Sequence, residues 1–434
     1  MQNLLKQSLF LIRVHLRASA VSLLLFAAGC ANPTGRSPEI SRALDDYNIG
    51  RYDAARATLA PLAAKTNNDY VLNNVRLGSV ALAEYDLPEA EAAFYRAYEV
   101  INSTKVNDLG RATAAALFSE SAKVWRGEPF ERAMVNFYLG LIYYMQHDYS
   151  NARAAFENSL FKLRDYGGAT KGDTDEYREV ESDFALALIM LGRCWQRLDR
   201  ADQAADCFAR AAKLRPDLAE LANDAQHARS NVLLVIEFGQ GPEKVMAGDN
   251  SVVGFYPTPS QVPPLPHPRV MVDGKPVRVK GLNNPTVDLI EMAQDRRWQS
   301  IDTIRVTKSV IGTGLMAAGA YQSAVKDDQG SAAALLAAGL LTKLSATADL
   351  RHWEMLPRTV YLVPLYLSPG KHDVTVGFGP GNRLSQTWHN IVAPESAEAT
   401  YFIRVTPTTS GTHEWPPPNY ATGRDEEQHV SHNE

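Results

Sequence analysis

Residues 185–216 read ALALIMLGRCWQRLDRADQAADCFARAAKLRP. Apolar residues recur in this stretch at the three- and four-residue spacing of amphipathic helices, and a charged segment interrupts them in the middle. Gly192 and Ala204 are small, so two helices joined by that segment could cross closely at these positions. The larger side chains of Trp195 and Phe208 would then fill the seam. The stretch therefore predicts a packed pair of helices.

The same pattern occurs more than once in the first half of the chain. The offset between Gly192 and Phe208 matches the tetratricopeptide repeat, a motif of about 34 residues built of two helices. Two upstream copies keep the same offsets: Leu139, Gly140, Tyr143, Ala152, Phe156 and Ser159 in one, and Leu77, Gly78, Ala81, Ala90, Phe94 and Ala97 in the other. Residues 39–62 resemble a degenerate first copy. The resemblance implies an all-α solenoid over residues 39–230, interrupted by extra helices or loops.

The concave surface of such a solenoid is its usual binding surface. Mostly apolar side chains occupy the inner positions of the predicted helices, and we select five as candidate partner-binding residues: Phe137, Leu141, Tyr144, Ile189 and Arg193. Two interpretations remain open. Either the chain's own inserts, such as residues 112–124, fill this groove, which is the interpretation we favour, or the groove takes a hydrophobic peptide from a partner.

After Asn231 the pattern changes from helices to strands. Residues 232–238 form a continuous apolar run that ends at Gly239, which is typical of a buried strand. Alternating residues on both sides of Asp273-Gly274 predict a β-hairpin. Further strands are expected at 359–367, 373–378, 386–392 and 400–405. These patterns predict a β-rich domain over residues 231–405, and the fold class is a multidomain α+β protein.

An unusual insertion lies within the predicted β-rich domain. Residues 309–348 contain two uncharged runs rich in alanine, leucine and glycine, separated by the polar segment 326–330. They predict a helical hairpin. Packing of this hairpin on the domain's own sheet is the favoured interpretation, because both runs fall short of the roughly 20 residues that cross a bilayer. Membrane insertion, or association through small residues, is the alternative.

The first thirty residues indicate export. Basic side chains precede the uncharged residues 18–28, a run that suits a secretory signal peptide but is too short for a mature membrane span. The run ends in Ala27-Ala28-Gly29-Cys30, which resembles the bacterial lipobox except that leucine is usual in place of Ala27. A plain cleaved signal and an uncleaved anchor are the alternatives.

The lipobox resemblance implies that residues 1–29 are removed and that Cys30 is lipidated with chains such as palmitate. Residues 30–38 would then tether the body to the membrane. Ala31 follows the cysteine in place of the aspartate associated with retention in the inner membrane. The resemblance therefore implies an outer-membrane lipoprotein of the cell envelope, facing the periplasm.

Residues 349–357 read DLRHWEMLP. Asp349, Arg351 and Trp353 alternate, so an extended chain would place them on one side, where the carboxylate could pair with the guanidinium against the indole. A buried structural pair is the favoured interpretation. A recognition patch is the alternative, and it adds Arg351 and Trp353 to the candidate partner-binding residues.

The lipobox, the irregular repeats, residues 127–132 (GEPFER) and the Asp-x-Arg-x-Trp-x-x-Leu-Pro pattern occur together in this chain. The combination resembles a family of uncharacterised bacterial envelope lipoproteins with tetratricopeptide repeats and a C-terminal β-rich domain. The resemblance covers most of the chain and brings no established activity. It implies that the protein acts together with regulators of peptidoglycan synthesis.

Residue patterns typical of catalysis and of metal or cofactor binding are not found. There is no GxSxG nucleophile turn, no phosphate-binding glycine loop and no CxxC or HExxH spacing. We therefore expect that the protein is not an enzyme and that it binds no metal and no cofactor. The net charge of −5 excludes nucleic acid as a favoured partner. Cys194 and Cys207 form either one disulfide or, as we favour, two buried thiols. Residues 406–434 are polar and proline-rich, and we expect them to be disordered.

These observations together predict a non-catalytic lipoprotein adaptor or scaffold of the cell envelope. Its repeats would bind an envelope protein, such as one of the cell-wall synthesis machinery, and its lipid would bind the membrane. The alternative is a binding module for a cell-wall glycan or an exported polysaccharide. Exposed aromatic side chains in a groove of the β-rich domain would favour that alternative.

Overall fold

The computed structural model describes residues 36–102, 124–163, 165–166, 179–180, 184–247, 252–256, 267–279, 281–294, 349–379, 383–406, 408 and 410–420. Several predicted features lie outside these residues: the signal segment 1–29, Cys30 and the hairpin at 309–348. The insert at 112–124 also lies outside them, except for Val124.

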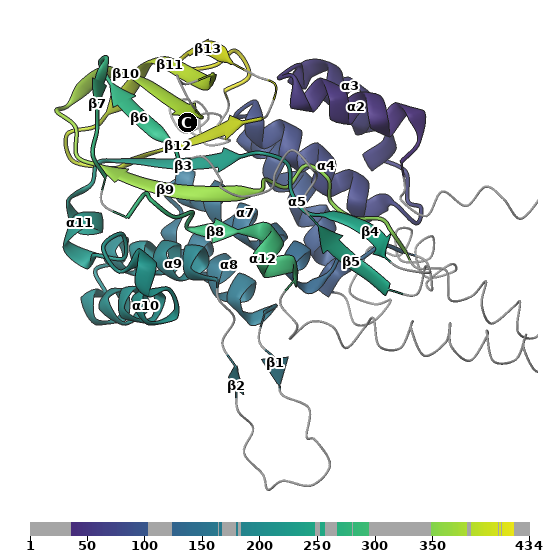
Figure 1. Cartoon of the computed structure of the whole chain (residues 1–434), viewed down its shortest axis with the longest axis horizontal. Helices are drawn as coiled ribbons and strands as arrows, with labels where there is room; N and C mark the ends of the chain where they lie inside the picture. The colour runs from purple at the N-terminus through teal and green to yellow at the C-terminus, as the bar shows by residue number, and fades with distance from the viewer. Residues whose placement is uncertain are drawn as a thin grey trace, which may run out of the picture.

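Helices make up the described part of the first half, and consecutive helices pack in pairs (Figure 1). The pairs are α2 (Pro38–Asn48) with α3 (Tyr52–Ala63), α4 (Tyr70–Ala83) with α5 (Leu87–Asn102), α7 (Pro129–Met145) with α8 (Tyr149–Phe161), and α9 (Ala185–Arg197) with α10 (Ala201–Leu214). The short helices η2 (Pro216–Leu218) and α11 (Asp224–Arg229) follow. Residues 165–166 and 179–180 pair as the two-residue strands β1 (Asp165–Tyr166) and β2 (Glu179–Val180).

One contact recurs in three of the four helix pairs. A glycine on the first helix faces the ring of a phenylalanine on the second, in the pairs Gly78–Phe94, Gly140–Phe156 and Gly192–Phe208. A Cβ added to the glycine would lie 2.9, 2.7 and 3.0 Å from the ring, respectively; the first two distances are closer than real Cβ atoms approach, and the third is tighter than most real contacts. Only glycine therefore allows the two helices to cross at this distance. In the first pair, Ala43 and Leu59 stand at the same offset and both are buried.

The turns between paired helices also repeat. Each contains a residue with positive φ seven positions after the small residue of the helix crossing: Gly50 (78°), Tyr85 (63°), His147 (60°) and Asp199 (57°). Positive φ reverses the chain tightly and is strained for residues other than glycine. A shared turn and a shared crossing give the four pairs one common geometry.

Strands make up most of the described part of the second half. They are β3 (Val232–Phe238), β4 (Glu243–Ala247), β5 (Val252–Tyr256), β6 (Arg269–Val272), β7 (Lys275–Pro276), β8 (Val287–Asp288), β9 (Thr359–Leu365), β10 (Gly370–Phe378), β11 (Leu384–Ala393), β12 (Ala399–Val405) and β13 (Gly411–Glu414), with one helix, α12 (Leu289–Gln294). The protein is thus a mixed α+β structure, helix-rich first and sheet-containing second. The predicted hairpin at Asp273-Gly274 is confirmed as the β6–β7 turn.

The strands form two larger sheets. One has the order β12-β3-β9-β8, and the other has the order β13-β11-β10-β6-β7. β3 is the centre of the first sheet: it pairs antiparallel with β9, from Val232 opposite Leu365, and parallel with β12, from Val232 opposite Ala399. Every residue of β3 and β9 is buried, so both faces of this sheet are covered.

Helices cover one face of the first sheet and the second sheet covers the other, which makes three layers (Figure 1). Phe238 of β3 and Phe378 of β10 stack at 4.1 Å between ring centres in the layer between the sheets. On the other face, the Tyr138 hydroxyl of α7 donates a hydrogen bond of 2.5 Å to the Glu237 carboxylate of β3. The inner side of the helix pairs is therefore occupied by the chain's own sheet.

The expectation of disorder from residue 406 onward is wrong for the part that the structure describes. Residues 411–414 form β13, which pairs parallel with β11. The next residue, Trp415, packs edge-on against Tyr85 and Tyr401 at 5.0 and 4.8 Å between ring centres. The proline-rich composition masked a strand and an aromatic anchor that gain stability from distant partners. Residues 421–434 lie outside the described part.

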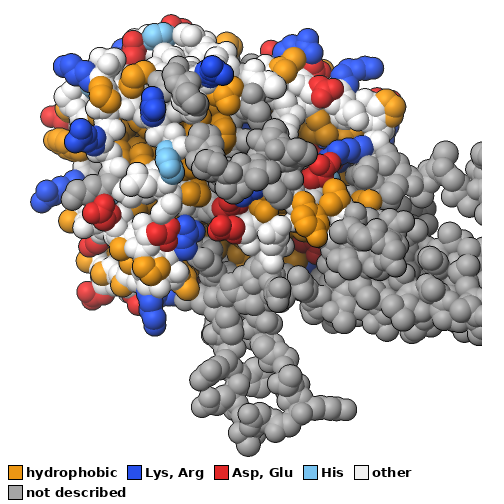
Figure 2. Space-filling view, viewed as in Figure 1, with side chains coloured by type: hydrophobic (Ala, Val, Ile, Leu, Met, Phe, Trp, Pro, Cys, Tyr) orange, Lys and Arg blue, Asp and Glu red, His pale blue; other side chains and the backbone are white. Residues whose placement is uncertain are grey.

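No helix among the described residues combines the length and the apolar character that a membrane crossing needs. Charged side chains of both signs are mixed over the face of the molecule seen in Figure 2. This mixed surface agrees with the small net charge of −5.

Candidate functional site

The five residues proposed for the groove all lie in the interior. Phe137, Leu141 and Tyr144 on α7, and Ile189 and Arg193 on α9, are each no more than 1% exposed. A partner could reach them only if the sheet moved away, so they form no accessible binding surface in this structure. The described filling of the groove is the chain's own sheet, whereas the insert at 112–124 that we favoured lies outside the described residues, except for Val124.

Arg193 belongs to a buried polar network around Glu398, which precedes β12. The Glu398 carboxylate accepts hydrogen bonds from Arg193, from Arg197 at 2.8 Å and from the Tyr144 hydroxyl at 2.8 Å. Burial alone would raise the pKa of Glu398, but the two guanidinium groups hold it below its usual range. The network therefore ties α7 and α9 to the sheet with compensated charge, and a binding role is not needed to explain Arg193.

Arg351 also makes structural contacts. Its guanidinium donates to Asp349 at 2.7 and 2.9 Å, to Asp69 at 2.8 Å and to the carbonyl of Asn68 at 2.8 Å. The pairing of Asp349 with Arg351 was expected from their alternation, whereas Asp69 comes from the turn before α4. Arg351 thus joins the residues before β9 to the helical half.

Trp353 is the largest fully buried side chain of the protein's described part. Its indole N–H donates to the Ser79 hydroxyl at 3.0 Å, and its ring packs against Phe94 and Tyr138 at 5.7 and 5.5 Å between ring centres. The favoured interpretation of a fixed structural element agrees with this burial. The structure leaves no part of Trp353 open to a ligand.

The two segments that carry the family resemblance contact each other. Glu131, from the GEPFER segment, accepts the backbone N–H of Trp353 at 2.7 Å and that of Glu128 at 2.7 Å. Glu128 and Glu131 also form the capping box that begins α7, and Glu128 pairs with Lys244 at 2.5 Å. The sequence marked both segments as unusual, but no local pattern could show that they meet.

Burial shifts the pKa values of the acidic groups where the residues before β9 meet the helical half. It raises the pKa of Glu131 to about 8. Burial would also raise the pKa of Glu354, but Arg76, at 2.7 and 2.9 Å, holds it below its usual range. His352 donates from Nδ1 to the Leu350 carbonyl at 2.9 Å, which leaves Nε2 to accept from Arg36 at 3.1 Å. Arg36, His352 and Glu354 line a cavity of about 270 Å³, where they pair with one another and so hold structure.

The described residues show no arrangement typical of metal or thiol chemistry. No group of three or more His, Cys, Asp or Glu side chains among them could hold a metal ion. Cys194 and Cys207 are both buried without a disulfide, as we favoured. Burial raises the pKa of the Cys194 thiol well above its usual value, which disfavours the reactive thiolate.

An open groove does exist on the outer side of the helices, between α8, the end of α9 and α10. We call this the outer groove; its volume is about 640 Å³. Its lining residues are Glu157, Asn158, Leu160, Phe161, Leu191, Trp195, Asp202, Gln203, Asp206, Cys207 and Arg210. Phe161 is 47% exposed, and the ring of Trp195 carries the Arg153 guanidinium at 5.0 Å. Sequence analysis placed Trp195 in the seam and overlooked its half-exposed edge.

The outer groove is acidic as well as apolar. Three carboxylates, those of Glu157, Asp202 and Asp206, line it together with a single arginine, Arg210. Arg210 lies 3.5 Å from Asp206, and Arg153 lies 2.7 Å from Glu157, so Asp202 is left without an arginine partner among the described residues. The lining therefore has a net negative charge beside exposed apolar rings, which suits a ligand that is both basic and apolar.

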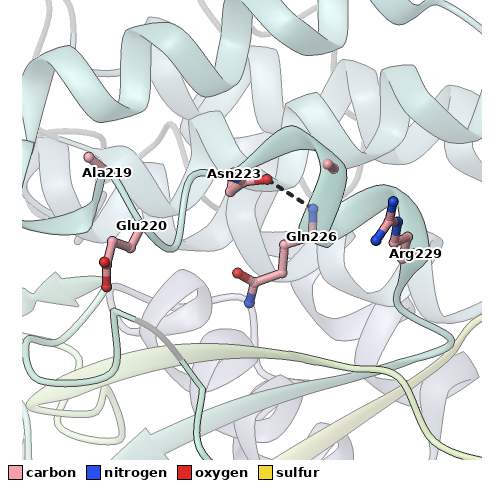
Figure 3. A pocket seen from close by; sticks show the side chains of 6 residues that line it. Ala219, Glu220, Asn223, Gln226 and Arg229 are labelled. Atoms are coloured by element: carbon pink, nitrogen blue, oxygen red, sulfur yellow. Dashed lines mark hydrogen bonds between the residues drawn. The ribbon is translucent and has the colours of Figure 1, made fainter.

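Another hollow, of about 620 Å³, lies beside α11 (Figure 3). Its side chains include Glu220, Asn223, Gln226 and Arg229. Asn223 accepts the backbone N–H of Gln226 at 3.1 Å, which is a helix cap, and Glu220 and Arg229 stand apart at its two ends in Figure 3. These polar groups do not converge on one point, so this hollow is a poor candidate for a site.

Comparison with known proteins adds little to this description. No protein family and no curated protein matches the chain. Two solved structures align with part of it. The crystal structure of MamA shares 12% identity over 45% of this chain and 87% of that one, with a TM-score of 0.29. The crystal structure of MamA protein shares 16% identity over 42% and 92%, with a TM-score of 0.21. Superpositions this loose carry no argument about function.

Proposed function

We propose that this chain is a non-catalytic scaffold of the bacterial cell envelope, anchored by lipid on Cys30, that binds a protein partner through its helical half. Tetratricopeptide repeats are the class to which we assign the four helix pairs. The repeated crossing, with glycine against phenylalanine in three pairs, and the repeated left-handed turn support this assignment. Such arrays serve mainly to present binding surfaces.

The observation that carries the proposal is the outer groove. Because the sheet fills the inner side of the repeats, the partner has to bind elsewhere, and the outer groove offers apolar rings next to the surplus carboxylate of Asp202. The occupant that fits is a segment of another envelope protein, an amphipathic helix with basic residues beside its apolar face. Cell-wall synthesis machinery is the source suggested by the family resemblance.

The proposed anchor would hold the body close to the membrane. Arg36 is fixed to Glu354 at 3.3 Å and to Glu243 at 3.3 Å, so the folded body begins by this residue. Even fully extended, the chain from Cys30 to Arg36 reaches only roughly 20 Å. A partner in the outer membrane, or close beneath it, would lie within reach of such a body.

Site-specific photo-crosslinking in intact cells tests the partner proposal. A photoreactive residue at Phe161, in the outer groove, should give a defined adduct, whereas the same residue at Tyr366, which is 77% exposed after β9, should not. Asp202→Lys should weaken the adduct at Phe161 by charge repulsion, and Glu220→Lys, near α11, serves as the matched control. Equal adducts at both positions, or an adduct unaffected by Asp202→Lys, would overturn the assignment of the groove.

The anchor needs its own test. Cys30→Ser should abolish palmitate labelling and release the protein from the outer-membrane fraction, because both depend on the thiol. A substituted protein that still incorporates palmitate and sediments with outer membranes would show that the lipobox interpretation is wrong.

The glycan-binding alternative gains no support among the described residues. It calls for exposed aromatic side chains along one groove of the β-rich half. Three exposed tyrosines are described there: Tyr256 at the end of β5, Tyr366 after β9 and Tyr420 near the last described residue. They belong to three different elements, and no cavity described above is lined by more than one of them.

A further inference from the structure

A separate cavity of about 470 Å³ lies where the first helix pair meets the two sheets. We call it the junction pocket. It is lined by Gly50, Arg51, Tyr52, Asp53, Ala54, Ala83, Glu84, Gln386, Trp388, Phe402, Arg404, His413, Pro417, Pro418 and Asn419. The turn between α2 and α3, the end of α4, strands β11, β12 and β13, and the last described residues all contribute. Small-molecule sites commonly form where separate layers meet in this way.

Glu84 is the unusual group in this pocket. Its residue is 7% exposed, and its Oε1 atom is buried with no hydrogen-bond partner. Its other oxygen accepts from Arg56 at 3.3 Å. Asp53 is the neighbouring carboxylate, and it receives only one donor, the Asn419 amide at 3.2 Å. A buried carboxylate oxygen without a donor is costly, so a donor is missing from this position.

Burial, reinforced by the neighbouring Asp53 carboxyl, raises the pKa of Glu84 to about 7. Two acidic side chains that face each other, with one arginine, Arg56, on the Glu84 side, favour keeping one proton between them. A ligand with its own positive charge would replace that proton. The geometry and the titration therefore agree that the Oε1 atom of Glu84 lacks a donor.

The arginines around the pocket do not meet this need, because each has another carboxylate close by. Arg51 lies 2.5 Å from Asp46, Arg56 lies 2.5 Å from Asp86, and Arg404 lies 3.6 Å from Glu237. Asp53 therefore has no arginine partner among the described residues, and Glu84 shares Arg56 with Asp86. His413, the other titratable lining group, has a lowered pKa because of burial and adds no positive charge at neutral pH.

Three aromatic side chains line another part of the pocket. Tyr52 faces the pocket from α3, and Trp388 and Phe402 face it from the two sheets. Trp388 is held in place by stacking on His413 at 4.5 Å between ring centres. Aromatic faces attract cations and also accept an apolar body.

We propose that the junction pocket binds the ammonium group of a small amine with an apolar body, held between Asp53 and the free oxygen of Glu84. The ammonium group supplies the hydrogen-bond donor that the Glu84 Oε1 atom lacks and adds a second donor to Asp53, and the apolar body rests against Tyr52, Trp388 and Phe402. This site is independent of the outer groove and of the lipid anchor. It gives the protein a second function as a receptor for a charged small molecule.

Isothermal titration calorimetry on the purified chain tests the proposal with tyramine as the probe. Its neutral counterpart, in which a hydroxyl replaces the amine, is the ligand control. Tyramine should bind, and the neutral alcohol should bind about tenfold more weakly or not at all, since it cannot form charge-assisted hydrogen bonds. A peptide with one lysine and blocked termini shows whether a side-chain amine binds more tightly than a free small molecule.

Protein variants separate the pocket from other surfaces. Glu84→Gln and Asp53→Asn should each weaken tyramine binding about tenfold, whereas Glu220→Gln, beside α11, should leave it unchanged. Asp53 is exposed, so Asp53→Asn reports on binding even if Glu84→Gln lowers stability; melting curves identify folded variants. The proposal is overturned if tyramine does not bind at millimolar concentration, if the alcohol binds equally well, or if both carboxylate variants bind as the parent does.

Discussion

Single residues set the spacing of the helical half. Gly192 faces the ring of Phe208 so closely that a Cβ would lie 3.0 Å from it, and Gly78 and Gly140 repeat this contact with their own phenylalanines. The glycine costs helix propensity, roughly 1 kcal/mol relative to alanine. The close crossing that it permits offsets this cost by burying the ring against the backbone.

Gly192→Leu should therefore destabilise the protein by about 1–3 kcal/mol or more, because the larger side chain overpacks the crossing and forces α9 away from α10. Chemical denaturation followed by circular dichroism measures the change. Ala209→Leu, at an exposed position of α10, is the matched control and should stay close to the parent. An unaltered denaturation midpoint for Gly192→Leu would contradict the crossing geometry.

Trp353 is the residue whose removal should cost most in the contact between the two halves. Trp353→Ala deletes a buried ring and a hydrogen bond to Ser79, and we expect a loss of about 3–5 kcal/mol. Trp353→Phe keeps most of the ring contacts and should lose considerably less. If Trp353→Ala abolished partner capture while its stability stayed at the parent value, Trp353 would be a recognition residue and the structural role would be wrong.

At the scale of elements, β13 is the least expected part of the fold. It forms the outer strand of the second sheet, parallel to β11, and Trp415 follows it into an aromatic cluster with Tyr85 and Tyr401. Because no local pattern distinguishes this strand from a flexible tail, its order depends on the surfaces that receive it.

Two truncations test this dependence. A chain ending at residue 410 lacks β13 and Trp415, so it should expose the edge of β11, melt at a lower temperature and aggregate more readily. A chain ending at residue 420 keeps both elements and should melt as the full chain does. Equal melting temperatures for the two truncations would show that β13 contributes nothing to stability.

The sequence predicted elements far better than it predicted their contacts. The continuous apolar run of β3, the Asp273-Gly274 turn and the paired helices were all expected, because local periodicity and turn chemistry report them. The same periodicity shows that the helices have apolar inner faces, yet it cannot show what covers those faces. A groove for a partner and a surface covered by a sheet from the same chain have the same pattern.

The residues of the outer groove and of the junction pocket were missed for a related reason. Glu84, Asp53 and Trp388 are distant in the sequence and match no catalytic or ligand motif, so only the folded chain brings them together. A buried glutamate at the end of a helix could have been noticed, but its missing donor could not. Arg193 was selected as an inner position of the groove and Arg351 for its alternation with Asp349 and Trp353, and both proved to be paired.

At the scale of the whole molecule, buried glutamates link stability to pH. Burial raises the pKa of Glu84 and Glu237 to about 7 and that of Glu131 to about 8, from the 4.5 of an exposed glutamate. Between these values the folded chain holds protons that the unfolded chain has released. The stabilising effect of these protons is complete at low pH and is lost as pH rises through about 7 to 8.

We therefore expect the free energy of unfolding to fall as pH rises from about 6.5 to about 8.5. At the lower end of this window His227 and His352, whose pKa values burial lowers, are partly protonated in the unfolded state alone; they oppose the trend there, but the three glutamates outnumber them and set its sign. Urea denaturation at constant ionic strength measures the trend. Glu237→Gln keeps an acceptor for the Tyr138 hydroxyl and should make the fall of the free energy of unfolding with pH less steep. A free energy of unfolding that rises over this window would contradict the expectation.

The pairing of β3 also decides when the protein can fold during synthesis. Val232 has Leu365 on one side and Ala399 on the other, so β3 emerges from the ribosome long before either neighbour exists. Until those strands arrive, the apolar inner faces of the helices have no cover, and closure of the long intervening segments is slow. The nascent chain thus exposes apolar surface for a prolonged time, during which a chaperone that prevents aggregation would be needed. Folding finishes only when β12 (Ala399–Val405) has been made.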